Sequence, residues 1–245
     1  MTQIKLIMTV LTLGLFLFPA CVPKYYAPTG INVPLFQEKN EVSANLSLAC
    51  TADLSGPQAQ VGYAFANHFG VIANGTYLSG LTPDNSPRGY GYLLEAGTGY
   101  FATLGKNLVF ETYIGAGTGK VVNKRTDNPF SIDLKKIYFQ PNFGYTSNKV
   151  DIAFSPRIVL IKYPDLYDGK KYITDIYGYP ILENNERLIL NDFQEDHFLV
   201  FEPAITIRGG WKQTKVQLQA VYSFHKIPYS EKLNINGGFY FTLAP

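Results

Sequence analysis

Ser223 and His225 are the side chains whose types and spacing come nearest to a catalytic pair in this chain. A histidine that takes the serine proton activates the hydroxyl as a nucleophile toward an acyl group. Residues two apart on a strand share a face but lie about 6–7 Å apart, so a direct hydrogen bond would need a bend. Glu231 or Glu202 would have to serve as the orienting acid. The alternative, which we favour, is that Ser223 and His225 are polar residues at the rim of a sheet, so we predict no catalytic residues.

The sequence predicts neither a metal site nor a phosphate loop. His68 falls in a short turn, while His197 and His225 fall on opposite faces of the predicted sheet, so the histidines do not converge on one ion. Asp196 is adjacent to His197, and adjacent residues on a strand point to opposite faces. The stretch GAGTGK at 115–120 lacks the spacing of a phosphate-binding loop and is not followed by a helix. We therefore predict no metal and no cofactor.

The composition excludes nucleic acid as a partner. The net charge is +2, only 16% of the residues are charged, and Lys and Arg are scattered among acids. Charged residues usually supply about a quarter of a soluble chain. The low charge, together with 15% aromatic residues, is therefore unusual for a protein whose whole surface faces water.

The N-terminus has the pattern of an export signal. The apolar run from Leu6 to Phe18 follows Lys5. It is shorter than the roughly 20 residues of a spanning helix, and it matches a secretory signal. Phe18, Pro19 and Ala20 before Cys21 resemble the lipobox of bacterial lipoproteins. This resemblance implies cleavage before Cys21, a diacylglycerol on its sulfur and an acylated amino terminus. The alternative is an ordinary secretory signal whose cysteine is incidental.

Cys50 has no partner in the chain once Cys21 is acylated, so no disulfide is expected. Residues 22–25 contain no acid. Acids at these positions resemble retention or surface-export signals, so their absence favours the inner face of an outer membrane. We divide the chain into a cleaved signal peptide at 1–20, a lipidated extended tether at 21–40, which contains Pro23, Pro28 and Pro34, and a β-barrel domain at 41–245.

From Glu41 onward the hydrophobic pattern has a period of two. Short connections such as Asn67-His68 alternate with long ones, the longest running from Pro164 to Asp196. Antiparallel strands with turns at one rim and loops at the other make an up-and-down barrel. We therefore predict an all-β fold, a single up-and-down antiparallel barrel of about ten strands. The strands are expected near 41–50, 58–66, 69–78, 90–103, 108–118, 132–146, 150–163, 197–209, 213–224 and 233–243.

Alternation alone does not tell which face of the sheet is buried. In the strand at 216–224, one face carries Val216 and Leu218, and the other carries Gln217 and Gln219. The polar faces of the strands are rich in small residues and hold few charges, which suits a crowded lumen, so the apolar faces are predicted to contact lipid. The predicted lumen charge network consists of Arg157, Glu202, Glu95, Glu111, Arg208 and Lys215.

Two details of this barrel are predicted from position along the strands. Arg157 and Glu202 lie on consecutive strands at similar distances from the turns, and we expect them to pair because an unpartnered buried charge is costly. Pro141, Pro156 and Pro203 lie on the apolar face of three successive strands. Because proline removes a ladder donor, we expect bulges or a local bend there.

The stretches YYAPTGINVPLFQEKNEVSANLSL and QVGYAFANHFGVIANGTY resemble the opening of small outer-membrane β-barrel proteins, particularly lipobox-bearing ones of the Bacteroidetes type. The resemblance implies this fold and no known activity. Ser223 and His225 resemble, in reverse order, the His-x-Ser of some outer-membrane lipid A deacylases. Asp196 and His197 resemble a pair in ten-stranded outer-membrane proteases, but they lack its same-face arrangement.

The leading interpretation is a lipid-anchored outer-membrane barrel with a structural, recognition or narrow-transport role. We expect a monomer whose partners are outer-membrane lipids, contacted through the barrel exterior and the acylated Cys21. About ten strands leave little free bore, which argues against a wide channel. The alternatives are a soluble periplasmic lipocalin-like lipoprotein that binds an apolar ligand, and a membrane-embedded lipid hydrolase that uses Ser223 and His225.

Overall fold

Burial alternates residue by residue along the strands, as the period of two in the sequence requires. In the computed structural model, the strand from His197 to Gly210 repeats exposed and buried positions almost without interruption. The structure describes residues 24–81, 87–124, 130–168, 173–174, 180–181 and 197–243. Within these ranges no helix is long and apolar enough to cross a membrane.

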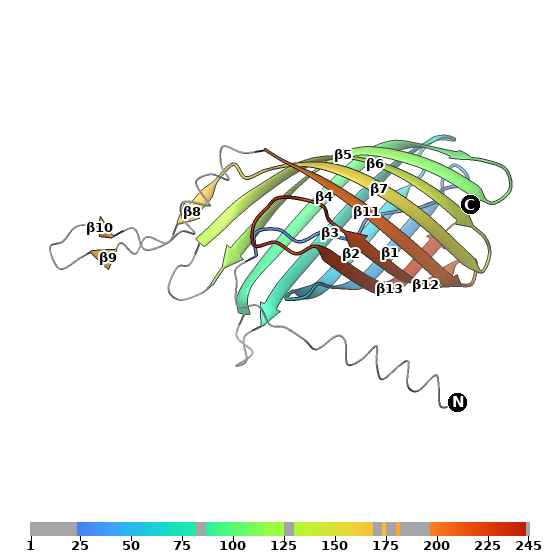
Figure 1. Cartoon of the computed structure of the whole chain (residues 1–245). Helices are drawn as coiled ribbons and strands as arrows, with labels where there is room; N and C mark the ends of the chain where they lie inside the picture. Colours follow the sequence, from blue (N-terminus) through green and yellow to red (C-terminus); the bar gives the residue numbers. More distant parts are fainter. Residues whose placement is uncertain are drawn as a thin grey trace, which may run out of the picture.

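Ten long antiparallel strands form a closed barrel (Figure 1). Each long strand pairs with the next along the chain, and β1 pairs with β13 to close the sheet. The predicted fold class is therefore confirmed. The short strand β8 (Leu166–Asp168) extends the sheet beside β6, and β9 (Ile173–Thr174) pairs only with β10 (Pro180–Ile181). The long strands are β1 (Val42–Cys50), β2 (Ser55–Tyr63), β3 (Phe69–Leu81), β4 (Pro87–Thr103), β5 (Leu108–Asn123), β6 (Phe130–Thr146), β7 (Val150–Lys162), β11 (His197–Gly210), β12 (Thr214–Tyr222) and β13 (Leu233–Leu243).

The two rims of the barrel differ in their connections. Short turns join β2 to β3, β4 to β5, β6 to β7 and β11 to β12 at one end, which we call the turn rim. The other connections lie at the opposite end, which we call the loop rim. One of them departs from the expected alternation, because β1 and β2 are joined by a tight turn in which the Thr51 amide donates to the Leu54 carbonyl at 2.8 Å.

The outer face of the barrel is apolar, whereas the inner face carries charged and polar side chains together with an apolar cluster near the loop rim that includes Ile132, Val159 and Val200. Leu199 on β11 is 68% exposed and Leu48 on β1 is 65% exposed. Arg157 and Glu202, which point inward, are completely buried. The apolar exterior is the reverse of the exterior of a water-soluble barrel, which is mostly polar.

Pro141, Pro156 and Pro203 lie in one row across β6, β7 and β11. Pro156 is directly opposite Pro203, and the β6–β7 ladder is interrupted between Phe139 and Phe143. The register is the same on both sides of this gap, so no extra residue is inserted and the expected bulges do not occur. Proline here removes ladder hydrogen bonds without shifting the strands.

Residues 24–36, which we call the lumen segment, run inside the barrel (Figure 1). Tyr25, Ile31, Val33 and Phe36 are completely buried. The sequence predicts an extended tether at 21–40. The described part is extended, but from Tyr25 to Phe36 it is packed within the strands. It begins at the loop rim and ends near the turn rim, where it leads into β1.

Candidate functional site

The lumen segment is extended because its sequence favours that conformation and because side chains of the barrel wall form hydrogen bonds with its backbone. Pro28 and Pro34 fix extended backbone and carry no amide hydrogen, so two fewer donors need partners inside the barrel. Ile31 is held like a residue in a β-ladder: its amide donates to Gln219 Oε1 and its carbonyl accepts from Gln219 Nε2, each at 2.8 Å. The Asn32 carbonyl accepts from Gln140 Nε2 at 2.7 Å.

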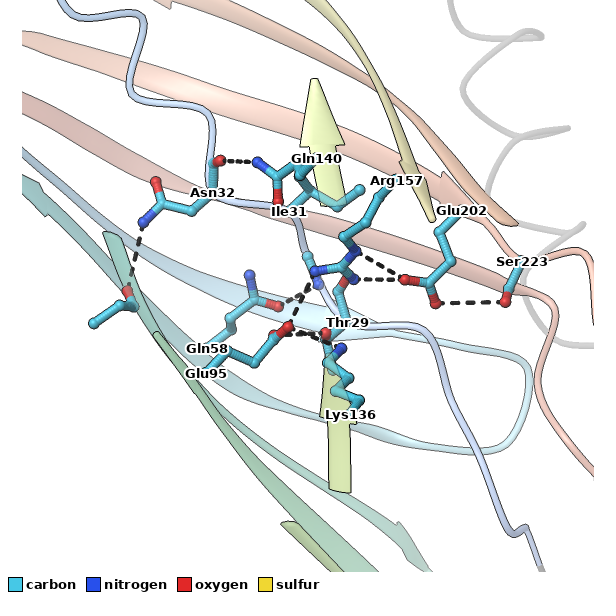
Figure 2. Close-up of polar contacts among 12 residues, drawn as sticks. Thr29, Ile31, Asn32, Gln58, Glu95, Lys136, Gln140, Arg157, Glu202 and Ser223 are labelled. Carbon is cyan, nitrogen blue, oxygen red and sulfur yellow. Dashed lines mark hydrogen bonds and ion pairs between the residues drawn. The ribbon is translucent and has the colours of Figure 1, made fainter. Parts of the chain in front are cut away.

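A charged cluster crosses the lumen beside this segment (Figure 2). Arg157 on β7 lies directly opposite Glu202 on β11, and Arg157 Nη2 is 2.7 Å from Glu202 Oε2. Arg157 Nη1 is also 3.1 Å from Glu95 Oε1, and Lys136 Nζ approaches the same oxygen at 2.8 Å. All four side chains are at most 1% exposed. Two cations thus neutralise two carboxylates in an interior that water does not reach.

A glycine on β5 makes part of this cluster possible. Gly117 lies between Glu95 and Lys136 in the sheet register. A Cβ atom at Gly117 would lie 3.0 Å from Glu95 Cγ. Because this position has no side chain, the carboxylate and the ammonium group on the two flanking strands can meet above it.

The lumen segment completes the charged cluster. The Tyr26 hydroxyl donates to Glu202 Oε1 at 2.5 Å, and the Thr29 hydroxyl donates to Glu95 Oε2 at 3.2 Å. The Thr29 carbonyl accepts from Arg157 Nη2 at 3.4 Å. A charge-assisted hydrogen bond is stronger than a neutral one, so the segment is fixed at the same place where the wall charges pair.

The other residues of the predicted network lie nearer the turn rim: Arg208 and Lys215 share Asp151, with Arg208 Nη1 3.8 Å from Asp151 Oδ2, and Glu111 contacts the end of the lumen segment. Arg208 Nη2 donates to the Val33 carbonyl at 2.6 Å, and its guanidinium carbon lies 3.6 Å from the centre of the Tyr240 ring. Lys215 Nζ is 2.5 Å from Asp151 Oδ1. Glu111 accepts from the Phe36 amide at 2.8 Å. Sequence reasoning placed these charges in the lumen but did not separate them from the Arg157 cluster.

An ion pair fixes the lumen segment at the loop rim. Lys24 Nζ lies 2.8 Å from Asp53 in the β1–β2 turn and 3.0 Å from Glu231 in the β12–β13 loop. Burial raises the pKa of the Glu231 carboxyl above its ordinary value, and the contact with Lys24 opposes that shift. Burial opposes the charge on Lys24, but its hydrogen bonds to Asp53 and Glu231 outweigh burial and raise its pKa. The Tyr25 amide also donates to the Tyr229 carbonyl at 3.0 Å.

Ser223 and His225 do not form a nucleophilic pair. The Ser223 hydroxyl donates to Glu202 Oε1 at 3.4 Å. His225 Nδ1 accepts from the Ile227 amide and Nε2 lies 3.2 Å from the Glu231 carbonyl, so both ring nitrogens have backbone partners. Burial lowers the pKa of His225. The carboxyl of Glu231 contacts Lys24 and does not orient the imidazole.

The other candidate residues are dispersed. His68 stacks on Tyr100 at the turn rim, and His197 is exposed on the outer face of β11. No group of three metal-ligating side chains occurs among the described residues. Residues 115–120 belong to β5. Cys50 is a free, exposed cysteine, while Cys21 and Asp196 lie outside the described residues.

Sequence reasoning missed the lumen segment, although it left a signal. Residues 27–36, APTGINVPLF, contain no charge. A tether in water is normally rich in charged and small polar residues, because nothing covers its apolar side chains. An uncharged stretch with Ile31, Val33 and Phe36 is better explained by burial.

Neither the protein-family models nor the curated proteins include a match to this sequence. Among solved structures, an outer-membrane channel from Pseudomonas putida F1 has a TM-score of 0.43 at 8% identity, covering 88% of this chain and 100% of that chain. The translocator domain of the autotransporter NalP from Neisseria meningitidis has a TM-score of 0.40 at 10% identity, covering 82% and 86%. LpxR from Salmonella typhimurium has a TM-score of 0.35 at 9% identity, covering 81% and 99%. All three TM-scores are below 0.5, so these likenesses decide nothing about activity or location.

Proposed function

We propose that this chain is a membrane-spanning barrel of the bacterial outer-membrane type, closed by its own lumen segment, with a structural or recognition role and no catalysis. The supporting observation is the polarity of the wall. Lipid can solvate the exposed apolar side chains of the exterior, while every charge of the Arg157 cluster is paired inside. Closed barrels are one of only two structures that satisfy all backbone groups in a bilayer, and even-numbered antiparallel ones are typical of outer membranes.

The soluble lipocalin-like alternative requires the opposite polarity. Its ligand cavity would be lined by apolar residues such as Leu199, Leu48 and Leu218, but these are more than half exposed on the outside. The lumen is instead occupied by the lumen segment, by charged residues and by an apolar cluster that packs against Tyr25 and Tyr26. The hydrolase alternative requires Ser223 and His225 to form a hydrogen-bonded pair. Instead, Ser223 donates to Glu202 and His225 contacts the Glu231 carbonyl.

Closure of the lumen can be tested by conductance in planar bilayers. The wild-type protein should show no stable open-pore steps, because the lumen segment is fixed at both rims and in the middle. Replacing residues 24–36 by a Gly-Ser linker of equal length should produce such steps. If the replacement prevents folding, Lys24→Ala combined with Arg208→Ala, which removes one fixing contact near each rim, serves instead. Open-pore conductance of the wild type would contradict the proposal.

Narrow transport is a second candidate, and a strip of polar side chains favours it. Asn45, Gln60 and Asn74 are direct neighbours across β1, β2 and β3 and point into the lumen. Both side-chain polar atoms of Asn45 and of Asn74, and Gln60 Nε2, have no hydrogen-bond partner among the described residues. Such groups can carry water or a small polar solute. Osmotic swelling of liposomes containing the wild type, abolished by Asn45→Leu/Asn74→Leu, would favour this candidate.

We also propose that Cys21 carries the acyl anchor and that the anchor belongs to the loop-rim leaflet. Lys24 lies at the loop rim. Three residues of extended chain reach no more than about 11 Å, so acyl chains on Cys21 would enter the leaflet at that rim. Longer loops normally face outward, which differs from the inner-face expectation. Mass spectrometry of the mature amino terminus tests the modification, and carbonate extraction of Cys21→Ala tests whether the barrel itself is integral.

A further inference from the structure

One part of the barrel exterior is basic. Lys135 on β6 is directly opposite Lys162 on β7, and Lys162 is directly opposite His197 on β11. All three side chains are exposed and share the outward phase of their strands. Adjacent strands are about 4.8 Å apart, so the row spans roughly 10 Å across the barrel surface.

This basic row lies at the border of the apolar belt. Two residues further toward the turn rim, the outward positions of the same strands are Ile137, Leu160 and Leu199. Toward the loop rim, the next outward pair on β5 and β6 is Lys120 and Asp133, joined by an ion pair of 3.1 Å. In the proposed membrane orientation, the basic row therefore lies at the height where lipid headgroups meet acyl chains.

The three side chains of the basic row have no partner within the described residues. No hydrogen bond or ion pair involves the side chain of Lys135, Lys162 or His197 there. The lumen cations, in contrast, are paired with carboxylates. Among the described residues, therefore, none supplies a counter-charge to the basic row.

A hollow in the outer wall begins at the basic row. Its volume is about 590 Å³, and its lining includes Leu94, Ala96 and Ala116 together with the three basic residues. A larger hollow of about 1070 Å³ continues toward the middle of the barrel and shares Ala96 and Ala116. The depression exists because Ala73, Ala96 and Ala116 are neighbours across β3, β4 and β5, where other outward positions carry larger side chains.

We propose that the basic row and this hollow bind one anionic membrane lipid, with a phosphate monoester headgroup, in the loop-rim leaflet. The phosphate contacts Lys135, Lys162 and His197, since ammonium groups bind phosphate as point charges. An acyl chain lies along Ala96 and Ala116. The inference rests on the proposed membrane location. Charge complementarity favours a lipid over a second copy of the chain, because the outward Asp133 is already paired with Lys120.

The test compares two lipids with identical chains. Full-length protein in nonionic detergent is titrated with dioleoyl phosphatidate or dioleoyl phosphatidylcholine, and bound lipid is measured by native mass spectrometry. Each lysine near an anionic lipid contributes a factor of about five. Lys135→Gln/Lys162→Gln/His197→Gln should therefore weaken phosphatidate binding roughly 25-fold or more and leave phosphatidylcholine binding unchanged.

Two controls separate the site from general charge and surface effects. Lys106→Gln/Lys149→Gln/Lys212→Gln removes three exposed lysines at the turn rim and should change nothing. Ala116→Leu fills the hollow without changing charge and should weaken phosphatidate binding, whereas Ala220→Leu on the outer face of β12 should not. Inorganic phosphate at millimolar concentration should fail to compete, because it has no acyl chain.

Equal phosphatidate affinity in the wild type and the basic-row variant would overturn the proposal, as would an equal loss in the turn-rim control or competition by inorganic phosphate. A dimer that dissociates in the basic-row variant would instead assign the surface to a second copy of the chain. Carbonate extraction distinguishes failure of the lipid-site proposal from failure of the membrane proposal. If the barrel resists extraction but shows no preference for phosphatidate, only the lipid-site proposal is wrong.

Discussion

At the scale of single residues, the lumen is organised by charges that neutralise one another. Arg157 contacts both Glu202 and Glu95, so its guanidinium is paired twice. The inward direction of Arg157 and Glu202 could be predicted from the period of two, and their equal height from the distance to the turns. The contact with Glu95 could not, because it crosses the lumen between strands that are not neighbours.

Removing one side of this pair should destabilise the barrel strongly. Glu202→Ala leaves Arg157 with one carboxylate and the Tyr26 hydroxyl without its acceptor, and breaking a buried pair typically costs about 3–5 kcal/mol. The double variant Arg157→Met/Glu202→Leu should cost clearly less, because no uncompensated charge remains. Urea unfolding in lipid vesicles measures both. If Glu202→Ala left the free energy of unfolding unchanged, the inner face would not be the buried one.

Glu41, at the turn rim just before β1, should make stability depend on pH. Burial raises the pKa of its carboxyl from 4.5 to about 7, while a hydrogen bond from the Gln37 amide opposes the shift. The folded state thus favours the neutral acid, so the free energy of unfolding should fall as pH rises from about 4.5 to 7, by at most about 3 kcal/mol. Glu41→Gln should remove this slope, which unfolding measured at pH 5 and pH 8 would reveal.

At the scale of elements, strands could be predicted well and the lumen segment could not. Strand periodicity is local, so β1 and β13 could be located within one residue of their observed ends. Residues 24–36 form no regular element, and their conformation depends on Gln219, Gln140 and Arg208 from distant strands. No sequence pattern within the lumen segment predicts which side chains of the barrel wall form hydrogen bonds with it.

The packing between β4, β5 and β6 should tolerate no side chain at Gly117. Gly117→Val inserts carbon atoms where Glu95 and Lys136 meet, and overpacking of this kind typically costs about 1–3 kcal/mol. Gly237 on β13 is the matched control, because the nearest atom to a Cβ there lies 3.8 Å away. Gly237→Val should therefore be nearly neutral in the same unfolding measurement. Equal costs at the two positions would show that strand propensity, and not the crowded lumen, decides the effect.

At the scale of the whole molecule, the barrel has an inverted polarity, with an apolar exterior and charges inside. Alternation in the sequence predicts that each strand has an apolar and a polar face, but it does not tell which face is buried. The deciding feature was the small size and low charge of the polar faces. The structure places the few charges inward, as in Arg157 and Glu202, and leaves residues such as Leu218 56% exposed. The exceptions to this rule among the described strands include Lys135, Lys162 and His197, which lie together on the outside, and the outward ion pair of Lys120 and Asp133.

The inverted polarity predicts how charge is tolerated on the exterior. Leu218→Arg, near the middle of β12, should reduce the free energy of unfolding in vesicles by about 2–4 kcal/mol. Thr214→Arg, at the start of the same strand near the turn rim, should cost about 0–1 kcal/mol. Leu218→Ala should cost less than Glu202→Ala, because it opens no internal cavity. A large cost for Leu218→Ala would indicate that this face is the core.

The path of the lumen segment also sets the order in which the barrel can be assembled. The residues that hold the segment come from strands all around the barrel, and several of them lie on the last strands: Glu202 and Arg208 on β11, Gln219 on β12 and Tyr240 on β13. These strands emerge last during synthesis, and the seam between β1 and β13 joins the two ends of the sheet. Residues 24–36 are made before every strand, so these contacts can form only after the last strands are in place.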